Sequence, residues 1–107
     1  MNKLNYDDTT EITMAPGVSR RVLSHTPELM LVEVTFASGA IVPVHSHPHQ
    51  QISYIKAGRF SFTNKGESEE AGPGDSLAFA SNVEHGVSCL EDGVVLDCFT
   101  PAREDFL

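Results

Sequence analysis

The most informative stretch of the chain spans residues 39 to 58 and reads Gly-Ala-Ile-Val-Pro-Val-His-Ser-His-Pro-His-Gln-Gln-Ile-Ser-Tyr-Ile-Lys-Ala-Gly. His45, His47 and His49 occupy alternate positions, and Gln51 follows in the same phase. Alternate residues of a β-strand share one face, so we expect His45 and His47 to project together. Pro48 is expected to break the strand, which separates His49 from that pair.

A further histidine, His85, begins a later segment that is also expected to be a strand. Two imidazoles on one strand and a third from another strand are typical of a transition-metal site, because neutral imidazole binds Zn, Fe, Ni and Cu. The alternative is that these histidines are solvated or hydrogen-bonded within the core. His25 lies in a polar turn and is expected at the surface.

Short β-strands separated by turns account for most of the chain. Turn sequences fall between apolar runs at Ser38-Gly39, Ala57-Gly58, Lys65-Gly66, Gly72-Pro73-Gly74 and Asp92-Gly93. The strands are expected over residues 18–23, 29–36, 41–46, 51–56, 59–64, 76–80, 84–90 and 94–100. A terminal turn is expected near residues 102–106. No long window has a helical period, which indicates an antiparallel sandwich or barrel.

The size and charge of the chain restrict its class. With 107 residues it is expected to form one domain, divided into a polar N-terminal arm at 1–16 and a barrel at 17–107. Seven basic against fifteen acidic residues give a net charge of −8, which speaks against nucleic acid and membrane partners. No apolar run is long enough to span a bilayer and no secretory signal is expected. We therefore expect a cytoplasmic protein in which Cys89 and Cys98 remain thiols.

Residues 39–58 resemble the first cupin motif, which is Gly, five residues, H-x-H, three or four residues, Glu, six residues and Gly. Gln51 stands where the Glu is usual. The second motif is Gly, five residues, P-x-G, two residues, His, three residues and Asn. From Gly74 onward the chain is similar to it at His85, with Ala80, Asn82 and Cys89 replacing Pro, Gly and Asn. Asn82 is a suitable replacement because asparagine tolerates a positive φ.

This resemblance implies an all-β protein with a single cupin domain, an antiparallel double-stranded β-helix or jelly-roll barrel. It also implies one divalent transition metal ion, with Ni, Zn, Fe and Mn left open, held by His45, His47, Gln51 and His85. A neutral amide in place of a carboxylate leaves the site with a net charge near +2 rather than +1, which favours a Lewis-acid role toward an anion. It also departs from the two-histidine, one-carboxylate set of oxygen-activating iron sites.

The C-terminal run 93–107, together with residues 17–21 and 45–49, resembles a narrower group, the pectin-degradation cupins. The ligand glutamine is also a feature of that group. The resemblance implies a metal-dependent, isomerase-type reaction that converts cyclic 4,5-unsaturated monouronates, from pectin or alginate breakdown, to linear 4-deoxy-5-keto uronates. It also implies a homodimer and a small anionic sugar as ligand.

Asp97 is unusual in the apolar run Val-Val-Leu-Asp-Cys-Phe, because aspartate is depleted in strands and costly to bury unpaired. It shares a strand face with Val95 and Phe99. If that face looks into the barrel, Asp97 could act as general acid and base. The alternative is that Asp97 faces solvent or pairs with an arginine, Arg59 or Arg103.

Arg103 follows the last expected strand and could bind a uronate carboxylate. Its alternative is a surface salt bridge with Glu104 or Asp105. Phe99 could pack on the apolar edge of the sugar or belong to the core.

Rival hypotheses are a metal-dependent cupin dioxygenase, a non-catalytic cupin that binds a small ligand, and a barrel that uses a metal only for stability. The outer face of residues 30–36 either packs under the N-terminal segment or meets a second subunit.

Overall fold

The computed structural model describes residues 1–107 and confirms the all-β prediction. Its strands are β1 (Ile12–Ala15), β2 (Val18–Thr26), β3 (Leu29–Phe36), β4 (Ile41–His45), β5 (Gln50–Asn64), β6 (Glu67–Ala71), β7 (Ser76–Phe79) and β8 (His85–Thr100). The helical segments are the single 3-10 turns η1 (Tyr6–Asp8) and η2 (Glu104–Phe106). None of the helices has the length and apolar character needed to cross a membrane.

β5 and β8 are each one long, bent strand, although the sequence predicts two shorter strands in each region. The turn-like pairs Ala57-Gly58 and Asp92-Gly93 mark shifts of register within the β5–β8 ladder, not chain reversals. At the bend the two glycines lie against each other, and a Cβ on Gly93 would come within 2.3 Å of the Ala57 carbonyl oxygen. Glycine is therefore needed there because the two backbones approach closely.

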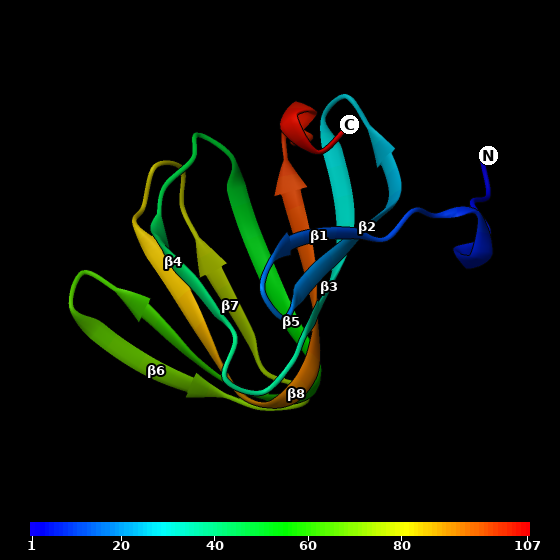
Figure 1. The fold of residues 1–107 in the computed structure, drawn as a ribbon. Coiled ribbons are helices and arrows are strands. Elements are labelled where there is room, and N and C mark those ends of the chain that lie inside the picture. Colours follow the sequence, from blue (N-terminus) through cyan, green and yellow to red (C-terminus); the bar gives the residue numbers. More distant parts are fainter.

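The bend divides the strands into two facing layers, as the paths of β5 and β8 in Figure 1 show. In one layer β3 pairs with the C-terminal half of β8, which pairs with the N-terminal half of β5. β2 and β1 extend this layer beyond β3, and β7 extends it beyond β5. In the other layer β4, the N-terminal half of β8, the C-terminal half of β5 and β6 lie in that order. The result is a single all-β domain built of two facing antiparallel layers.

The hydrophobic core fills the space between the layers. Met30, Val32, Val34 and Phe36 of β3 are all buried, as the period of two predicts for one face of that strand. Phe60 is fully buried and packs edge-on against Phe36, with ring centroids 5.1 Å apart. The same core extends to Phe79 and Phe99, whose rings pack against histidines.

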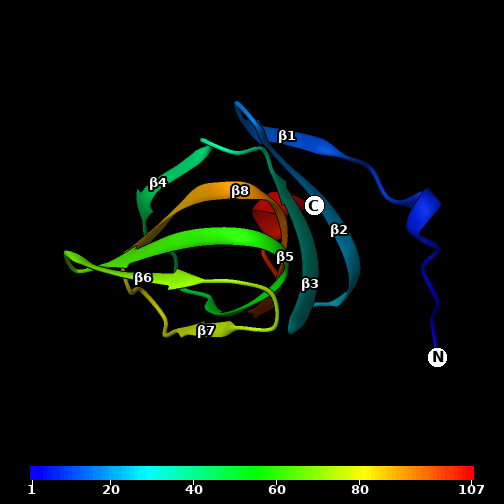
Figure 2. The same ribbon diagram turned by 90° about the horizontal axis from the view of Figure 1, so that it is seen from below.

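Two strands carry no clear sequence signal. β6 is mostly glutamate and is exposed, but the Lys65-Gly66 turn, in which both residues have positive φ, folds it back on β5. β1 lies inside the polar N-terminal segment and pairs with β2. Before β1 the chain stands away from the barrel (Figure 2). This N-terminal segment is anchored to β3 by Tyr6, whose hydroxyl donates a hydrogen bond to Glu33 Oε1 at 2.6 Å.

Candidate metal centre

Three histidines meet between the two layers. His45 ends β4, His85 begins β8, and the two residues are partners in the ladder between these strands. β4 ends at His45, one residue before the expected end of this strand, and His47 lies in the loop that follows. The His47 ring still faces the other two. One ligand atom from each histidine lies within 4.8 Å of the others. This cluster could bind a metal ion.

The loops that carry His47 and His85 are joined by hydrogen bonds. The backbone N–H of Asn82 donates to the carbonyl of His47 at 2.8 Å, and the Ser81 hydroxyl donates to the carbonyl of Pro48. Asn82 has a φ of 63°. This left-handed conformation favours glycine, so the prediction that Asn82 replaces the glycine of the second motif is confirmed. The two cupin motifs therefore meet through this loop contact.

Each of the three imidazoles is oriented by a backbone carbonyl. Nδ1 of His45 lies 2.8 Å from the Pro43 oxygen, Nδ1 of His47 lies 3.1 Å from the His49 oxygen, and Nδ1 of His85 lies 2.9 Å from the Val83 oxygen. A carbonyl only accepts, so these partners assign the ring proton to Nδ1. The lone pair of each ring is therefore on Nε2, as in ligands of a metal.

Two further observations, at His85 and at His47, bear on whether a cation fits between these rings. Nε2 of His85 is buried and has no hydrogen-bond partner. Nε2 of His47 lies 3.0 Å from Oε1 of Gln51, which places two lone pairs opposite each other. A positive group beside them would satisfy all of these atoms. Nitrogen donors with an amide oxygen suit a divalent transition metal, so the residues present fit such an ion.

Burial also keeps these rings in the form that binds a metal. Desolvation lowers the pKa of His47 and of His85, and the positive charge of Arg103 adds to the lowering at both rings. Phe79 contributes to this burial by stacking on His85, with ring centroids 4.4 Å apart. Both rings therefore favour the neutral state.

A hydrogen-bonded network fixes the amide of Gln51. Its Nε2 donates to Ser53 Oγ at 2.9 Å and to Asp97 Oδ1 at 3.3 Å, which leaves Oε1 turned toward His47. Ser53 is fully buried, and its hydroxyl donates to Asp97 Oδ1 at 2.6 Å. Burial raises the pKa of Asp97 to about 6, against the opposing effect of the bonds from Ser53 and Gln51.

The Asp97 side chain therefore neither faces solvent nor pairs with an arginine, the two alternatives to a position inside the barrel. Arg59 lies 3.7 Å from Glu70, and Arg103 pairs with Asp105. The Asp97 carboxyl group instead lies inside the barrel, beside the amide of Gln51.

Arg103 lies at the same end of the barrel. Its guanidinium is 5.3 Å from the ring centroid of Phe99, which packs edge-on against His47 with centroids 5.7 Å apart. Phe99 is also buried, so it belongs to the hydrophobic core as well as to the surroundings of His47 and Arg103. The salt bridge of Arg103 to Asp105, one of the sequence alternatives, is present at 2.8 Å.

Sequence reasoning did not identify Ser53 or Phe79. Both lie opposite residues of the site in the ladders of β5, Ser53 facing Asp97 and Phe79 facing Gln51. Only the strand pairing reveals them. His49 remains outside the cluster, with its ring edge-on to His47 at 5.4 Å. His25 is exposed near the end of β2, as expected.

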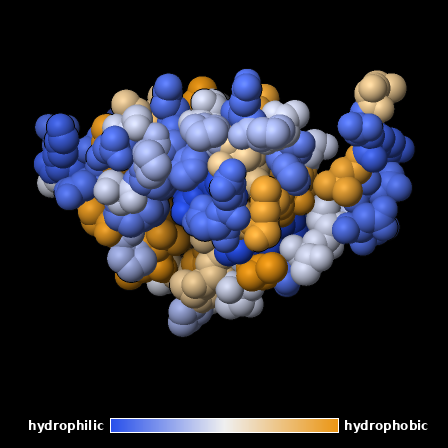
Figure 3. Space-filling view, turned by 90° about the horizontal axis from the view of Figure 1, so that it is seen from above, coloured by the Kyte–Doolittle hydropathy of each residue, from blue (hydrophilic) through white to orange (hydrophobic).

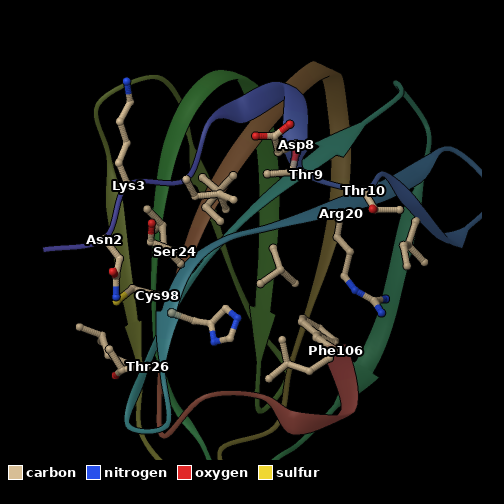
Figure 4. A pocket seen from close by; sticks show the side chains of 18 residues that line it. Asn2, Lys3, Asp8, Thr9, Thr10, Arg20, Ser24, Thr26, Cys98 and Phe106 are labelled. Carbon is tan, nitrogen blue, oxygen red and sulfur yellow. The ribbon is translucent and has the colours of Figure 1, made fainter.

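A cleft of about 890 Å³ lies elsewhere, between the N-terminal arm and the sheet (Figure 4). None of the three clustered histidines lines it. The face seen from above in Figure 3 is mixed, with hydrophilic residues over much of it and hydrophobic residues in its centre and along its lower part. The histidine cluster and this cleft are therefore separate features of the molecule.

Comparison with known proteins agrees with this geometry. The cupin domain model matches residues 32–99. Pectin degradation protein KdgF of Dickeya dadantii strain 3937 is 40% identical over 103 residues, covering 94% of each chain. The structure of KdgF from a Halomonas species is 35% identical with a TM-score of 0.94, covering 100% of this chain and 99% of that chain.

An RmlC-like cupin from Shewanella frigidimarina is 34% identical with a TM-score of 0.94, covering 100% of this chain and 96% of that chain. The matched domain residues include all three clustered histidines, Gln51 and Asp97. The chain therefore belongs to the cupin family and is closely related to the pectin degradation protein KdgF.

Proposed function

We propose that this protein converts cyclic 4,5-unsaturated monouronates, from pectin or alginate breakdown, to linear 4-deoxy-5-keto uronates in a metal-dependent, isomerase-type reaction. The observation that carries the proposal is a half-buried carboxyl group, Asp97, held one side chain away from a cluster of imidazoles whose Nε2 atoms are free to bind a cation. The relationship to a pectin degradation protein supports the substrate class.

In this proposal His45, His47, His85 and the Oε1 atom of Gln51 hold a divalent metal ion, one of Ni, Zn, Fe or Mn. Such an ion supplies positive charge that stabilises negative charge developing on substrate oxygens. Because all four donors are neutral, none of that charge is cancelled by the ligands themselves. An anionic sugar therefore suits the site better than a neutral sugar.

The chemistry requires a group that accepts and donates one proton. In the substrate, the ring oxygen joins the hemiacetal carbon to C5 of the C4=C5 double bond. Loss of the anomeric hydroxyl proton opens the ring and leaves an enolate at C5, and addition of a proton at C4 gives the C5 ketone. No water, oxygen or electron is consumed, so the step balances as an isomerisation.

Asp97 is the group proposed to move this proton. A pKa of about 6 lies close to neutrality, which allows the carboxyl group both to accept and to return a proton. The hydrogen bonds from Ser53 and Gln51 engage Oδ1, and no partner is found for Oδ2. Oδ2 is therefore the atom assigned to the substrate.

Arg103 and Phe99 are proposed to bind the sugar. A guanidinium donates two parallel hydrogen bonds to a carboxylate, which distinguishes a uronate from a neutral sugar. Phe99 forms an apolar wall between Arg103 and His47, against which the less polar edge of the ring can pack.

The proposal includes a cytoplasmic setting, with which the free thiols of Cys89 and Cys98 are consistent. It also includes a homodimer. Leu31, Cys98 and Ile52 lie side by side across β3, β8 and β5 on the outer face of the barrel. Leu31 and Ile52 are exposed, and Leu31 and Cys98 also line the cleft beneath the N-terminal arm. We assign this apolar row to the contact between two copies.

The decisive experiment mixes metal-loaded protein with a freshly made unsaturated monouronate and follows the loss of alkene absorbance. We expect rapid loss that a chelator abolishes, with formation of the linear 5-keto uronate and no uptake of oxygen at an electrode. Oxygen consumption would instead indicate a dioxygenase. Saturable binding of the sugar without turnover would indicate a binding cupin.

A further inference from the structure

The C-terminal turn η2 folds back on the arginine that precedes it. Nε and Nη2 of Arg103 donate to the two carboxylate oxygens of Asp105 at 3.2 and 2.8 Å. The ring centroid of Phe106 lies 4.2 Å from the Arg103 guanidinium carbon, and that of Phe99 lies 5.3 Å from it. One edge of the guanidinium and its planar face are therefore occupied by side chains of the same chain.

The adjacent Nη1–Nη2 edge of the guanidinium has no such partner. The bonds to Asp105 use the hydrogen of Nε and one hydrogen of Nη2, so the donors that remain are on Nη1 and Nη2. Among residues 1–107 no acceptor is found for these donors. They form a second fork with the geometry that a carboxylate requires.

Phe106 is itself held from the other side by β2. The guanidinium carbon of Arg20 lies 4.2 Å from the ring centroid of Phe106, and both side chains are labelled in Figure 4. Arg20 forms no ion pair and no side-chain hydrogen bond in the chain, so its guanidinium is held by this contact with the ring. The position of the turn is therefore anchored to the sheet and does not depend on Asp105 alone.

We propose that Asp105 and Phe106 are positioning residues that hold Arg103 with its free Nη1–Nη2 edge presented to the carboxylate of the substrate. Asp105 sets the rotation of the guanidinium within its plane, and Phe106 sets the plane. Holding the long side chain in one conformation before binding lowers the entropy lost when the carboxylate binds. This inference rests on the proposed function, because it takes Arg103 as the carboxylate-binding group.

The consequence is selectivity for a free carboxylate over its ester. A methyl ester has no negative charge, and one of its oxygens carries carbon, so it cannot accept two parallel hydrogen bonds. An arginine held in place should favour the acid more strongly than a mobile one, because only the acid can use both hydrogen bonds of the fixed fork. Discrimination between the two ligands therefore measures the positioning directly.

The test uses the full, metal-loaded chain and calorimetric titration with D-galacturonate and its methyl ester. The variants are Asp105→Asn and Phe106→Leu. Glu104→Gln is the matched control, because Glu104 lies in the same turn and makes no contact with Arg103 among the hydrogen bonds and ion pairs. Melting temperatures report the folding of each variant. Asp105 is 57% exposed, so its variant is expected to fold normally even if the core change at Phe106 is harmful.

We expect wild type and Glu104→Gln to prefer the acid, and Asp105→Asn and Phe106→Leu to lose about tenfold of that preference while binding the ester as before. Unchanged preference in Asp105→Asn, tighter acid binding by that variant, or equal loss of both ligands would overturn the inference. So would a wild type that binds acid and ester alike. A wild type that prefers the acid through Asp105, yet leaves the unsaturated uronate unconverted, would reject only the proposed reaction.

Discussion

The three imidazoles take their orientation from backbone carbonyls that lie two residues away from each ring. Pro43 and Val83 precede His45 and His85, and His49 follows His47. These contacts tie each tautomer to the local course of the chain, so the Nε2 atoms are free for a metal before any metal binds. The unpartnered Nε2 of His85 is stable in this environment only with a cation or a water molecule beside it.

Replacement of His45 by alanine should lower metal content and activity together, because the site then loses one of its imidazole ligands. We expect about one equivalent of metal in the wild type and a large loss in His45→Ala, measured by elemental analysis after gel filtration. His25→Ala is the control, since His25 is exposed near the end of β2 and outside the cluster. A His45→Ala protein with wild-type metal content would disprove the ligand assignment.

Asp97→Asn should retain fold and metal but lose activity by at least about a hundredfold, the usual contribution of a general acid or base. The amide has nearly the same shape and still accepts from Ser53, so the network around Gln51 is expected to persist. Steady-state rates on the unsaturated uronate test this, with Asp7→Asn in the exposed N-terminal segment as control. Near-normal turnover by Asp97→Asn would remove the proposed proton carrier.

At the scale of elements, the bend in β5 and β8 brings the parts of the site together. It places Gln51, Ser53 and Asp97 in one layer and the His45–His85 pair in the other. The bend depends on close contact between Gly58 and Gly93, since a Cβ on Gly93 would also lie 2.9 Å from the Cα of Gly58. Local backbone geometry thus determines the separation of the two halves of the site.

Gly93→Ala should destabilise the protein by about 3 kcal/mol or more, because the new methyl group meets backbone atoms that cannot rotate away. Urea unfolding measures the free energy of unfolding. Gly39→Ala is the comparison: Gly39 has a φ of 87°, but a Cβ there would have no atom within 4 Å, so the cost is conformational and nearer about 1 kcal/mol. Equal effects of the two substitutions would contradict the steric account of the bend.

At the scale of the whole molecule, a metal bound only by the folded state stabilises that state. At a free metal concentration 100-fold above Kd the gain is about 2.7 kcal/mol, which corresponds to roughly 10–20 °C in Tm for a domain of this size. We expect a chelator to lower Tm by this order and added metal to restore it. His45→Ala should show little response to either, and a wild type whose Tm ignores both would argue against a metal held by the fold.

The outer apolar row of Leu31, Cys98 and Ile52 belongs to the same scale. If two copies meet there, Ile52→Lys should convert a dimer to a monomer, because a lysine in the contact would be buried without a partner. Light scattering during gel filtration measures the mass. Ile41→Lys is the control, since Ile41 is 59% exposed on β4 in the other layer. A dimer that survives Ile52→Lys would place the contact elsewhere.

Much of the molecule follows from patterns that are local in the chain. The burial of alternate residues in β3 reflects the period of a strand, the left-handed conformation of Asn82 reflects its own side chain, and the H-x-H spacing brings His45 and His47 close with few residues between them. Composition and turn residues are likewise enough to indicate an antiparallel β-protein. Each of these features depends on neighbouring residues alone.

Other features arise only when distant segments pair. Ala57-Gly58 has the composition of a turn, and whether it reverses or bends the chain depends on the approach of Gly93 from another strand. The contact of Ser53 with Asp97 joins residues that are 44 positions apart, and its existence requires the register of β5 on β8. Strand register and the close approach of two backbones are properties of the folded chain. Both are set by packing between segments, and the separation of those segments in sequence carries no information about their distance in space.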